Sequence, residues 1–147
     1  MEALTLEKGL KIIEGAFAKS AEMKLKPLVI ALFDARGCLK AFQSQDGQEA
    51  LIRSDIAQAK AYGALAMGIG SRTIAKRAKD GPAFIATALE LAGGRLMPVA
   101  GGVLIRDAEG RIAGALGVSG DTSDNDELCA IAGIEGAGFK ADPGSST

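Results

Sequence analysis

The sequence predicts an α+β fold, with a single antiparallel β-sheet and flanking helices. Two four-residue segments, Asp34–Gly37 and Asp107–Gly110, each begin with Asp, end with Gly and separate two strand-like segments. This pattern is typical of β-hairpins. Amphipathic segments with helical spacing precede and follow these hairpins. No expected strand leads directly into a Gly-x-Gly-x-x-Gly helix start, which argues against a parallel dinucleotide-binding sheet.

The first expected element is an amphipathic helix over Thr5–Met23. Four apolar residues recur at helical spacing: Leu6, Leu10, Ile13 and Phe17. These four residues share one face, which is typical of an amphipathic helix. Thr5 is suited to cap it, and Pro27 stops it and starts an extended segment. The first hairpin follows, with strands expected at Leu28–Phe33 and Cys38–Gln43.

The middle of the chain is expected to be mainly helical. Its expected elements are a helix over Ala50–Met67, a short helix capped by Ser71, a short helix over Ala83–Leu91 with Pro82 near its start, and an edge strand at Leu96–Val99. Proline is tolerated best at a sheet edge, which is why Pro98 favours an edge strand there.

The last expected unit is a hairpin followed by a glycine-rich corner and a helix. Strands are expected at Val103–Arg106 and Ile112–Val118, and Thr122 or Ser123 can cap the helix after the corner. The residues from Ala141 to Thr147 are rich in Pro, Gly and Ser, so we expect one domain over residues 1–140 and a disordered tail over 141–147.

The composition excludes several classes of partner. The 147 residues carry a net charge of −1, with 4% aromatic residues and no Trp, so nucleic acid is not an expected partner. No segment resembles a membrane span or a signal peptide, so we expect a cytoplasmic protein that does not bind membranes. Histidine is absent, which excludes histidine-based catalysis and histidine-ligated metals.

The glycine-rich corner is the leading candidate for a ligand site. Its backbone N–H groups and hydroxyls could hold a carboxylate or an enolate-like oxygen. The ligand-binding candidates here are Ser119, Gly120, Asp121 and Thr122. The same residues could instead only cap the following helix. The acids after the corner could bind a hard cation, but their spacing is not that of an EF-hand and helix capping explains them, so we expect no metal site.

Lys60 is a charged residue on an otherwise apolar helical stripe. At a pocket wall it could pair with an anionic ligand, or act as a base or Schiff-base amine if burial lowers its pKa. It could instead extend to the surface, or form a salt bridge with Asp46 or Asp126. We take Lys60 and Asp126 as the candidate catalytic residues that would move a proton.

Two further sets of residues could contact a ligand. A basic segment comprises Arg72, Lys76, Arg77 and Lys79. It could attract an acidic substrate or a propionate, although a solvated helix face would look the same; Arg72 is the ligand-binding candidate here. Tyr62 is the only tyrosine and could ligate ferric haem, or could be a partly buried residue with one hydrogen bond.

Several of these segments resemble the GlcG/HbpS family, also called the haem-degrading domain family, which includes the C-terminal domain of PduO-type proteins. The segments that carry the resemblance are Gly101-Gly102-Val103, Gly114 to Gly120, Asp126-Glu127 and Ala132-Gly133-Ile134. We include Gly101 and Gly102 among the ligand-binding candidates. The resemblance implies a profilin-like α/β sandwich that assembles into homo-oligomers. A family Lys-Ala pair corresponds to Lys60-Ala61.

The resemblance and the residues together leave three functional hypotheses. The first is a protein that binds a small anionic ligand, with haem or a related tetrapyrrole implied by the resemblance. Without histidine, any axial iron ligand would come from Cys, Met or Tyr. The second is an isomerase, hydratase or decarboxylase acting on a small organic acid in a catabolic pathway. The third is a structural subunit of an oligomer.

Overall fold

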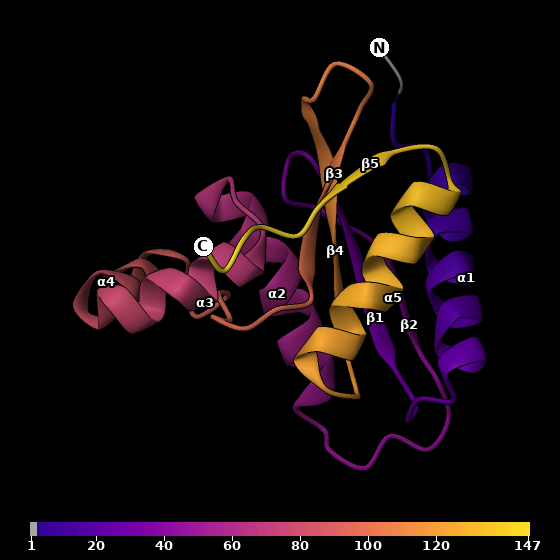
Figure 1. Cartoon of the computed structure of the whole chain (residues 1–147), viewed down its shortest axis with the longest axis horizontal. Helices are drawn as coiled ribbons and strands as arrows, with labels where there is room; N and C mark the ends of the chain where they lie inside the picture. The colour runs from indigo at the N-terminus through magenta and orange to yellow at the C-terminus, as the bar shows by residue number, and fades with distance from the viewer. Residues whose placement is uncertain (1–2) are drawn as a thin grey trace.

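The computed structural model describes residues 3–147, which form five helices and one five-stranded antiparallel sheet (Figure 1). The strand order is β2-β1-β4-β3-β5. The strands are β1 at Val29–Asp34, β2 at Leu39–Ser44, β3 at Gly102–Arg106, β4 at Ile112–Ser119 and β5 at Lys140–Asp142. Every neighbouring pair is antiparallel, which confirms the predicted α+β class.

Both predicted hairpins are present. The strands β1 and β2 form the first, and β3 and β4 form the second. The closing glycines Gly37 and Gly110 both have φ of +82°, a conformation that glycine adopts without steric cost. The two hairpins join through β1 and β4, where Ile30 lies opposite Val118.

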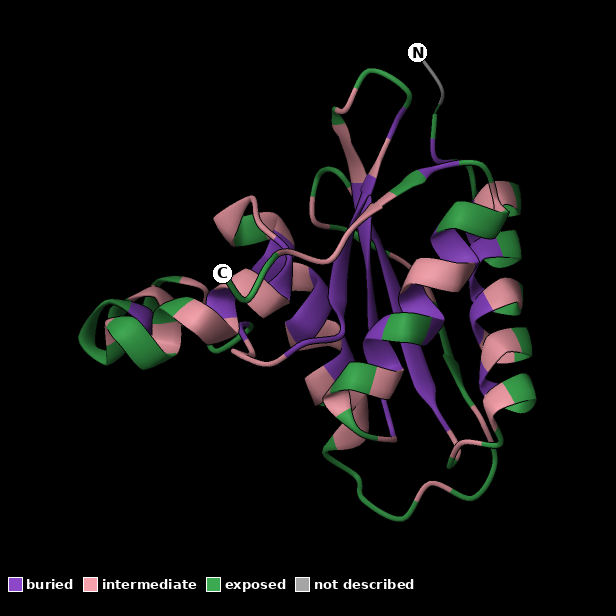
Figure 2. Cartoon of the chain, in the orientation of Figure 1, coloured by how far each residue is buried: buried purple, intermediate pink, exposed green. Residues whose placement is uncertain are grey.

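Helices cover both faces of the sheet. The helices α1 (Leu6–Met23) and α5 (Ser123–Gly136) lie on one face, and α2 (Arg53–Met67) lies on the other. Leu28, just before β1, and Ile30 and Leu32 within it face α1 and α5. Val29, Ala31 and Phe33 face α2. Because both faces are covered, β1 reads as a continuous apolar run and is buried along its length (Figure 2).

The helices α3 (Ser71–Asp80) and α4 (Pro82–Leu91) project from this sandwich (Figure 1). They share a small apolar cluster that contains Ile74, Ile85 and Leu96. Among the helices of the described chain, none is both long and apolar enough to cross a membrane.

The structure corrects four local predictions. The α2 helix begins at Arg53, three residues later than expected from Ala50. Ser71 does not cap α3, because its hydroxyl accepts a hydrogen bond from the Gly102 N–H at 2.7 Å. The expected edge strand at Leu96–Val99 is absent, since Leu96 packs into the α3–α4 cluster instead.

The fourth correction concerns the expected disordered tail. Ala141 lies opposite Ile105 in β5, which takes the sheet edge beside β3. Beyond β5, the Arg72 N–H donates to the Pro143 carbonyl at 3.2 Å, and the Ser145 N–H donates to Thr73 Oγ1 at 2.8 Å. The C-terminal segment is therefore held against the start of α3.

Candidate functional site

Lys60 and Asp126 form a buried ion pair at the end of the sheet where β4 meets the glycine-rich corner. The Lys60 ammonium donates to Asp126 Oδ2 at 3.1 Å and to the Val118 carbonyl at 2.8 Å. The two side chains are 2% and 1% exposed. The structure therefore contains one of the two salt bridges considered from the sequence, that with Asp126.

Burial affects the two members of the pair in opposite directions. It lowers the pKa of Lys60, although the Asp126 charge partly opposes this. It raises the pKa of Asp126, although the Lys60 charge and the hydrogen bond from the Asp121 N–H oppose it. Neither side chain lines the main pocket described below, so their geometry is that of a structural cross-link between α2, β4 and α5.

Gly101 and Gly102 lie against this pair because they have no side chain. A Cβ on Gly101 would lie 2.8 Å from the Lys60 ammonium nitrogen, and one on Gly102 would lie 2.1 Å from the Lys60 carbonyl oxygen. Gly101 also has φ of +117°, which disfavours other residues. Both glycines therefore allow α2 to approach β3, and neither lines the main pocket.

The polar groups of the corner after β4 are hydrogen-bonded mainly to one another. Asp121 accepts hydrogen bonds from the Thr122 N–H, the Asn125 side-chain amide and the Lys26 N–H. Thr122 caps α5 by accepting from the Asn125 N–H at 3.2 Å. Hydrogen bonds from these donors lower the pKa of Asp121. An anion would meet the Asp121 and Asp126 carboxylates here, so the corner's geometry is that of a helix cap.

The other two residues of the corner, Ser119 and Gly120, make no side-chain hydrogen bonds within residues 3–147. The Ser119 hydroxyl is buried and has no hydrogen-bond partner among the described residues. Gly120 lines a small pocket of about 360 Å³ together with Lys26 and Arg53. Within residues 3–147, no three acidic or cysteine side chains gather in a way that could hold a metal ion.

A pocket with a volume of about 460 Å³ lies between α3, the Pro98–Ala100 segment and the start of α5. Its lining residues are Arg72, Ala75, Lys76, Ala78, Lys79, Pro98, Val99, Ala100, Ser123, Asp124 and Ser146. The α3 residues among them follow helical spacing and so share one face. The volume lies within the range typical of small-molecule sites.

Arg72 holds one wall of this pocket together. Its Nε donates to both carboxylate oxygens of Glu127, at 3.2 and 2.9 Å, and its terminal nitrogens reach Asp124 and the Ser146 hydroxyl. These hydrogen bonds to carboxylates raise the pKa of Arg72. Arg72 therefore ties α3 to α5 and to the C-terminal segment, with each of its three guanidinium nitrogens making a hydrogen bond.

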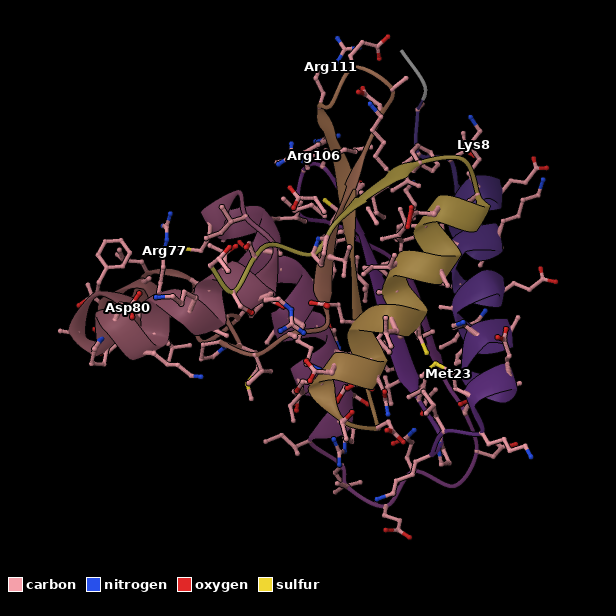
Figure 3. All side chains as sticks on the ribbon, viewed as in Figure 1. Lys8, Met23, Arg77, Asp80, Arg106 and Arg111 are labelled. Carbon is pink, nitrogen blue, oxygen red and sulfur yellow. The ribbon has the colours of Figure 1, made fainter. Side chains whose placement is uncertain are left out.

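Two lysines supply the positive charge that remains at the pocket. Lys76 forms an ion pair with Asp80 one turn later in α3. Lys79 has no acidic partner within residues 3–147. Because i and i+3 side chains are neighbours on a helix, the two ammonium groups can act on one ligand. Figure 3 shows Arg77 of the same helix projecting outward, and Arg77 does not line this pocket.

Tyr62 lies apart from the pocket. The Arg95 guanidinium lies 3.5 Å from the centre of its ring, and the edge of Phe33 packs against it with ring centres 6.0 Å apart. The structure thus brings Lys60 and Asp126 together, places Arg72 at the pocket and keeps Tyr62 away from it.

Most of the residues that line the pocket cannot be recognised from the sequence. Its apolar wall consists of small residues such as Ala75, Pro98 and Val99, which carry no chemical signature. The spacing of Arg72, Lys76 and Lys79 was the available signal, because it places three cations on one face of α3.

Comparisons with known proteins agree with this architecture. Residues 4–135 match a family model described as haem degrading protein HbpS-like. A 15.0 kDa protein from Citrobacter freundii, encoded in the dhaT-dhaS intergenic region and uncharacterized, is 29% identical over 133 residues, which cover 90% of each chain. A PduOC–haem complex has a TM-score of 0.83 at 22% identity, covering 94% of this chain and 97% of that chain. HbpS has a TM-score of 0.80 at 25% identity, covering 94% and 92%.

Proposed function

Since the chain belongs to the HbpS-like family of haem degrading proteins, we propose that it binds a tetrapyrrole-type ligand, with a flat apolar body and carboxylate groups, in the pocket beside α3. The observation that carries the proposal is the combination of an apolar wall and two lysines. Pro98, Val99 and Ala75 offer apolar surface to a ring, and Lys76 and Lys79 offer ammonium groups to its carboxylates.

The comparisons support this class of ligand. The PduOC structure is described as a haem complex, and the matched family is described as haem degrading. Haem has a flat apolar ring and two propionates on one edge, which matches the two chemistries of the pocket. When bound elsewhere, its iron commonly takes an axial protein ligand such as His, Cys, Met or Tyr.

The residues of the pocket do not fit iron coordination. The sequence has no histidine, and the pocket lining contains no Cys, Met or Tyr. Cys129 is buried within α5, where burial raises the pKa of its thiol to about 11, and Cys38 lies between β1 and β2. We therefore assign the ligand's carboxylates and ring, rather than its iron, to this chain's residues.

Titration with hemin tests the proposed function. We expect saturable binding at one equivalent, weakened about tenfold in a Lys76→Ala/Lys79→Ala variant, because two exposed ion pairs together contribute about 1.4 kcal/mol. The measurement is the change in visible absorption at low ionic strength, where screening is weakest.

Arg77→Ala is the matched control, because it removes one positive charge from the same helix outside the pocket. It should bind hemin as the wild type does. An unsaturable change in the wild type, or equal weakening by the control and the lysine variant, would contradict binding at this pocket.

The catalytic alternative requires Lys60 or Asp126 to contact a substrate. Both are almost fully buried and hydrogen-bonded to each other, so no observation favours it.

We also propose that α4 packs against a second copy of the chain, consistent with the assembly that the resemblance implies. Its sequence is almost entirely apolar, yet only Ile85 is buried. Phe84 is 63% exposed and Leu91 is 85% exposed. Most of α4 is coloured as exposed in Figure 2. Such an unpartnered apolar helix is typical of a subunit interface.

A Phe84→Ser/Leu91→Ser variant should shift the protein to a smaller species in size-exclusion chromatography with light scattering, because apolar contact area between copies is lost. The control is Leu6→Ser, at an exposed position on α1. A wild type that is already monomeric would overturn the proposal.

A further inference from the structure

The pocket beside α3 offers cations and apolar surface to a ring with carboxylates, but its lining holds no His, Cys, Met or Tyr, the usual axial ligands of haem iron. Its cations come from α3, its apolar surface from Ala75, Ala78 and the Pro98–Ala100 segment, and its hydroxyls from Ser123 and Ser146. Resting on the function proposed above, we infer that the chain recognises the tetrapyrrole through its carboxylates and ring face, so that the central metal contributes nothing to affinity.

The positions of the lysines support recognition of two carboxylates. Lys76 and Lys79 are three residues apart in a helix, so their stems leave α3 about one turn apart, near 5 Å. Two propionates on one edge of a tetrapyrrole can each meet one ammonium group. Lys79 has no acidic partner within residues 3–147, and Lys76 is held only by the exposed Asp80.

The negatively charged residues at the pocket lie on the side next to Arg72. Asp124 is the one acidic residue in the lining, and it is paired with Arg72. Glu127 beside it is also bound by Arg72. The carboxylates of the protein are therefore neutralised locally, which leaves the lysine side of the pocket for an anionic group.

Two of the side chains that could bind iron, those of Tyr62 and Cys129, lie elsewhere in the fold. The ring of Tyr62 is enclosed by Arg95 and Phe33 on the α2 side of the sheet. Cys129 belongs to the core cluster on the opposite face. An iron bond to either residue would require a site other than this pocket.

The test compares three probes on the whole chain: hemin, metal-free protoporphyrin IX and protoporphyrin IX dimethyl ester. Fluorescence of the metal-free rings and visible absorption of hemin give the dissociation constants in one buffer. We expect hemin and protoporphyrin IX to agree within about threefold and the dimethyl ester to bind at least about tenfold more weakly. The Lys76→Ala/Lys79→Ala variant should weaken both acids equally and leave the ester unchanged.

The outcomes separate this inference from the proposed function. Hemin that binds more than tenfold tighter than protoporphyrin IX, with a sharp Soret band that is lost in a Tyr62→Phe variant, would overturn the inference and leave tetrapyrrole binding standing. Equal binding of the acid and the ester would also overturn it. Failure of all three probes to bind would overturn the proposed function as well.

Discussion

Substituting Lys60→Met is expected to destabilise the protein by about 3–5 kcal/mol, because it removes one partner of a buried ion pair. The methionine side chain is similar in length and would fill the space. It would leave the Asp126 carboxylate and the Val118 carbonyl without the donor they share, in surroundings where Lys60 and Asp126 are 2% and 1% exposed. Urea denaturation at pH 7 measures the loss.

The double variant Lys60→Met/Asp126→Leu provides the test of mechanism. If the cost arises from an unpaired buried charge, removing both charges should cost less than the sum of the two single variants. Some loss should remain, because Asp126 also accepts a hydrogen bond from the Asp121 N–H at 3.0 Å. Additive effects, or a loss below about 1 kcal/mol for Lys60→Met, would mean that the pair does not support the fold.

The stability of the single variant Lys60→Met should also depend on pH. Without Lys60, burial of the Asp126 carboxyl outweighs the hydrogen bond from the Asp121 N–H and raises the pKa of Asp126 above the unfolded value of about 3.9. The folded state then binds a proton over a pH range in which the unfolded state does not, so the free energy of unfolding rises as the pH falls through that range. The deficit of Lys60→Met relative to the wild type should therefore shrink between pH 7 and mildly acidic pH.

The turns and helix spacing made the elements of the fold predictable. Both hairpins follow from an aspartate at the start of a turn and a glycine at its end, which are local features. The pairing of β1 with β4 joins distant segments and has no local signature. Leu96–Val99 has a strand-like composition, but Leu96 packs against Ile74 and Ile85 instead, and β5 takes the edge beside β3.

Residues of the site could be predicted only where a residue differs in polarity from its sequence neighbours. Lys60 could be singled out because a lysine interrupts an apolar helical stripe, and one of its two suggested partners, Asp126, is the one found. The corner residues attracted attention because caps and anion sites use the same residue types, and only the observed hydrogen bonds distinguish them. The apolar wall of the pocket forms where α3 meets the Pro98–Ala100 segment, and a linear pattern does not encode that meeting of two segments.

Gly117→Ala is expected to destabilise the protein by about 3 kcal/mol or more, because a side chain there has no space. Gly117 lies in β4 on the face that α2 covers. A Cβ would come within 1.9 Å of the Ala57 carbonyl oxygen and 2.9 Å of the Ala61 backbone nitrogen. Both neighbours are backbone atoms of α2, so the helix as a whole would have to move away from the sheet, and Lys60 moves with it.

The control is Gly136→Ala at the end of α5, where a Cβ would meet nothing within 4 Å. Alanine favours helix over glycine by up to about 1 kcal/mol, so this variant should be as stable as the wild type or slightly more stable. Urea denaturation of the three proteins measures the difference, and amide exchange in α2 locates it. If Gly117→Ala matched the control, α2 would not be held in backbone contact with β4. If it is destabilised and α2 exchanges faster than α1, the glycines of β3 and β4 set the distance at which α2 and its buried lysine lie on the sheet.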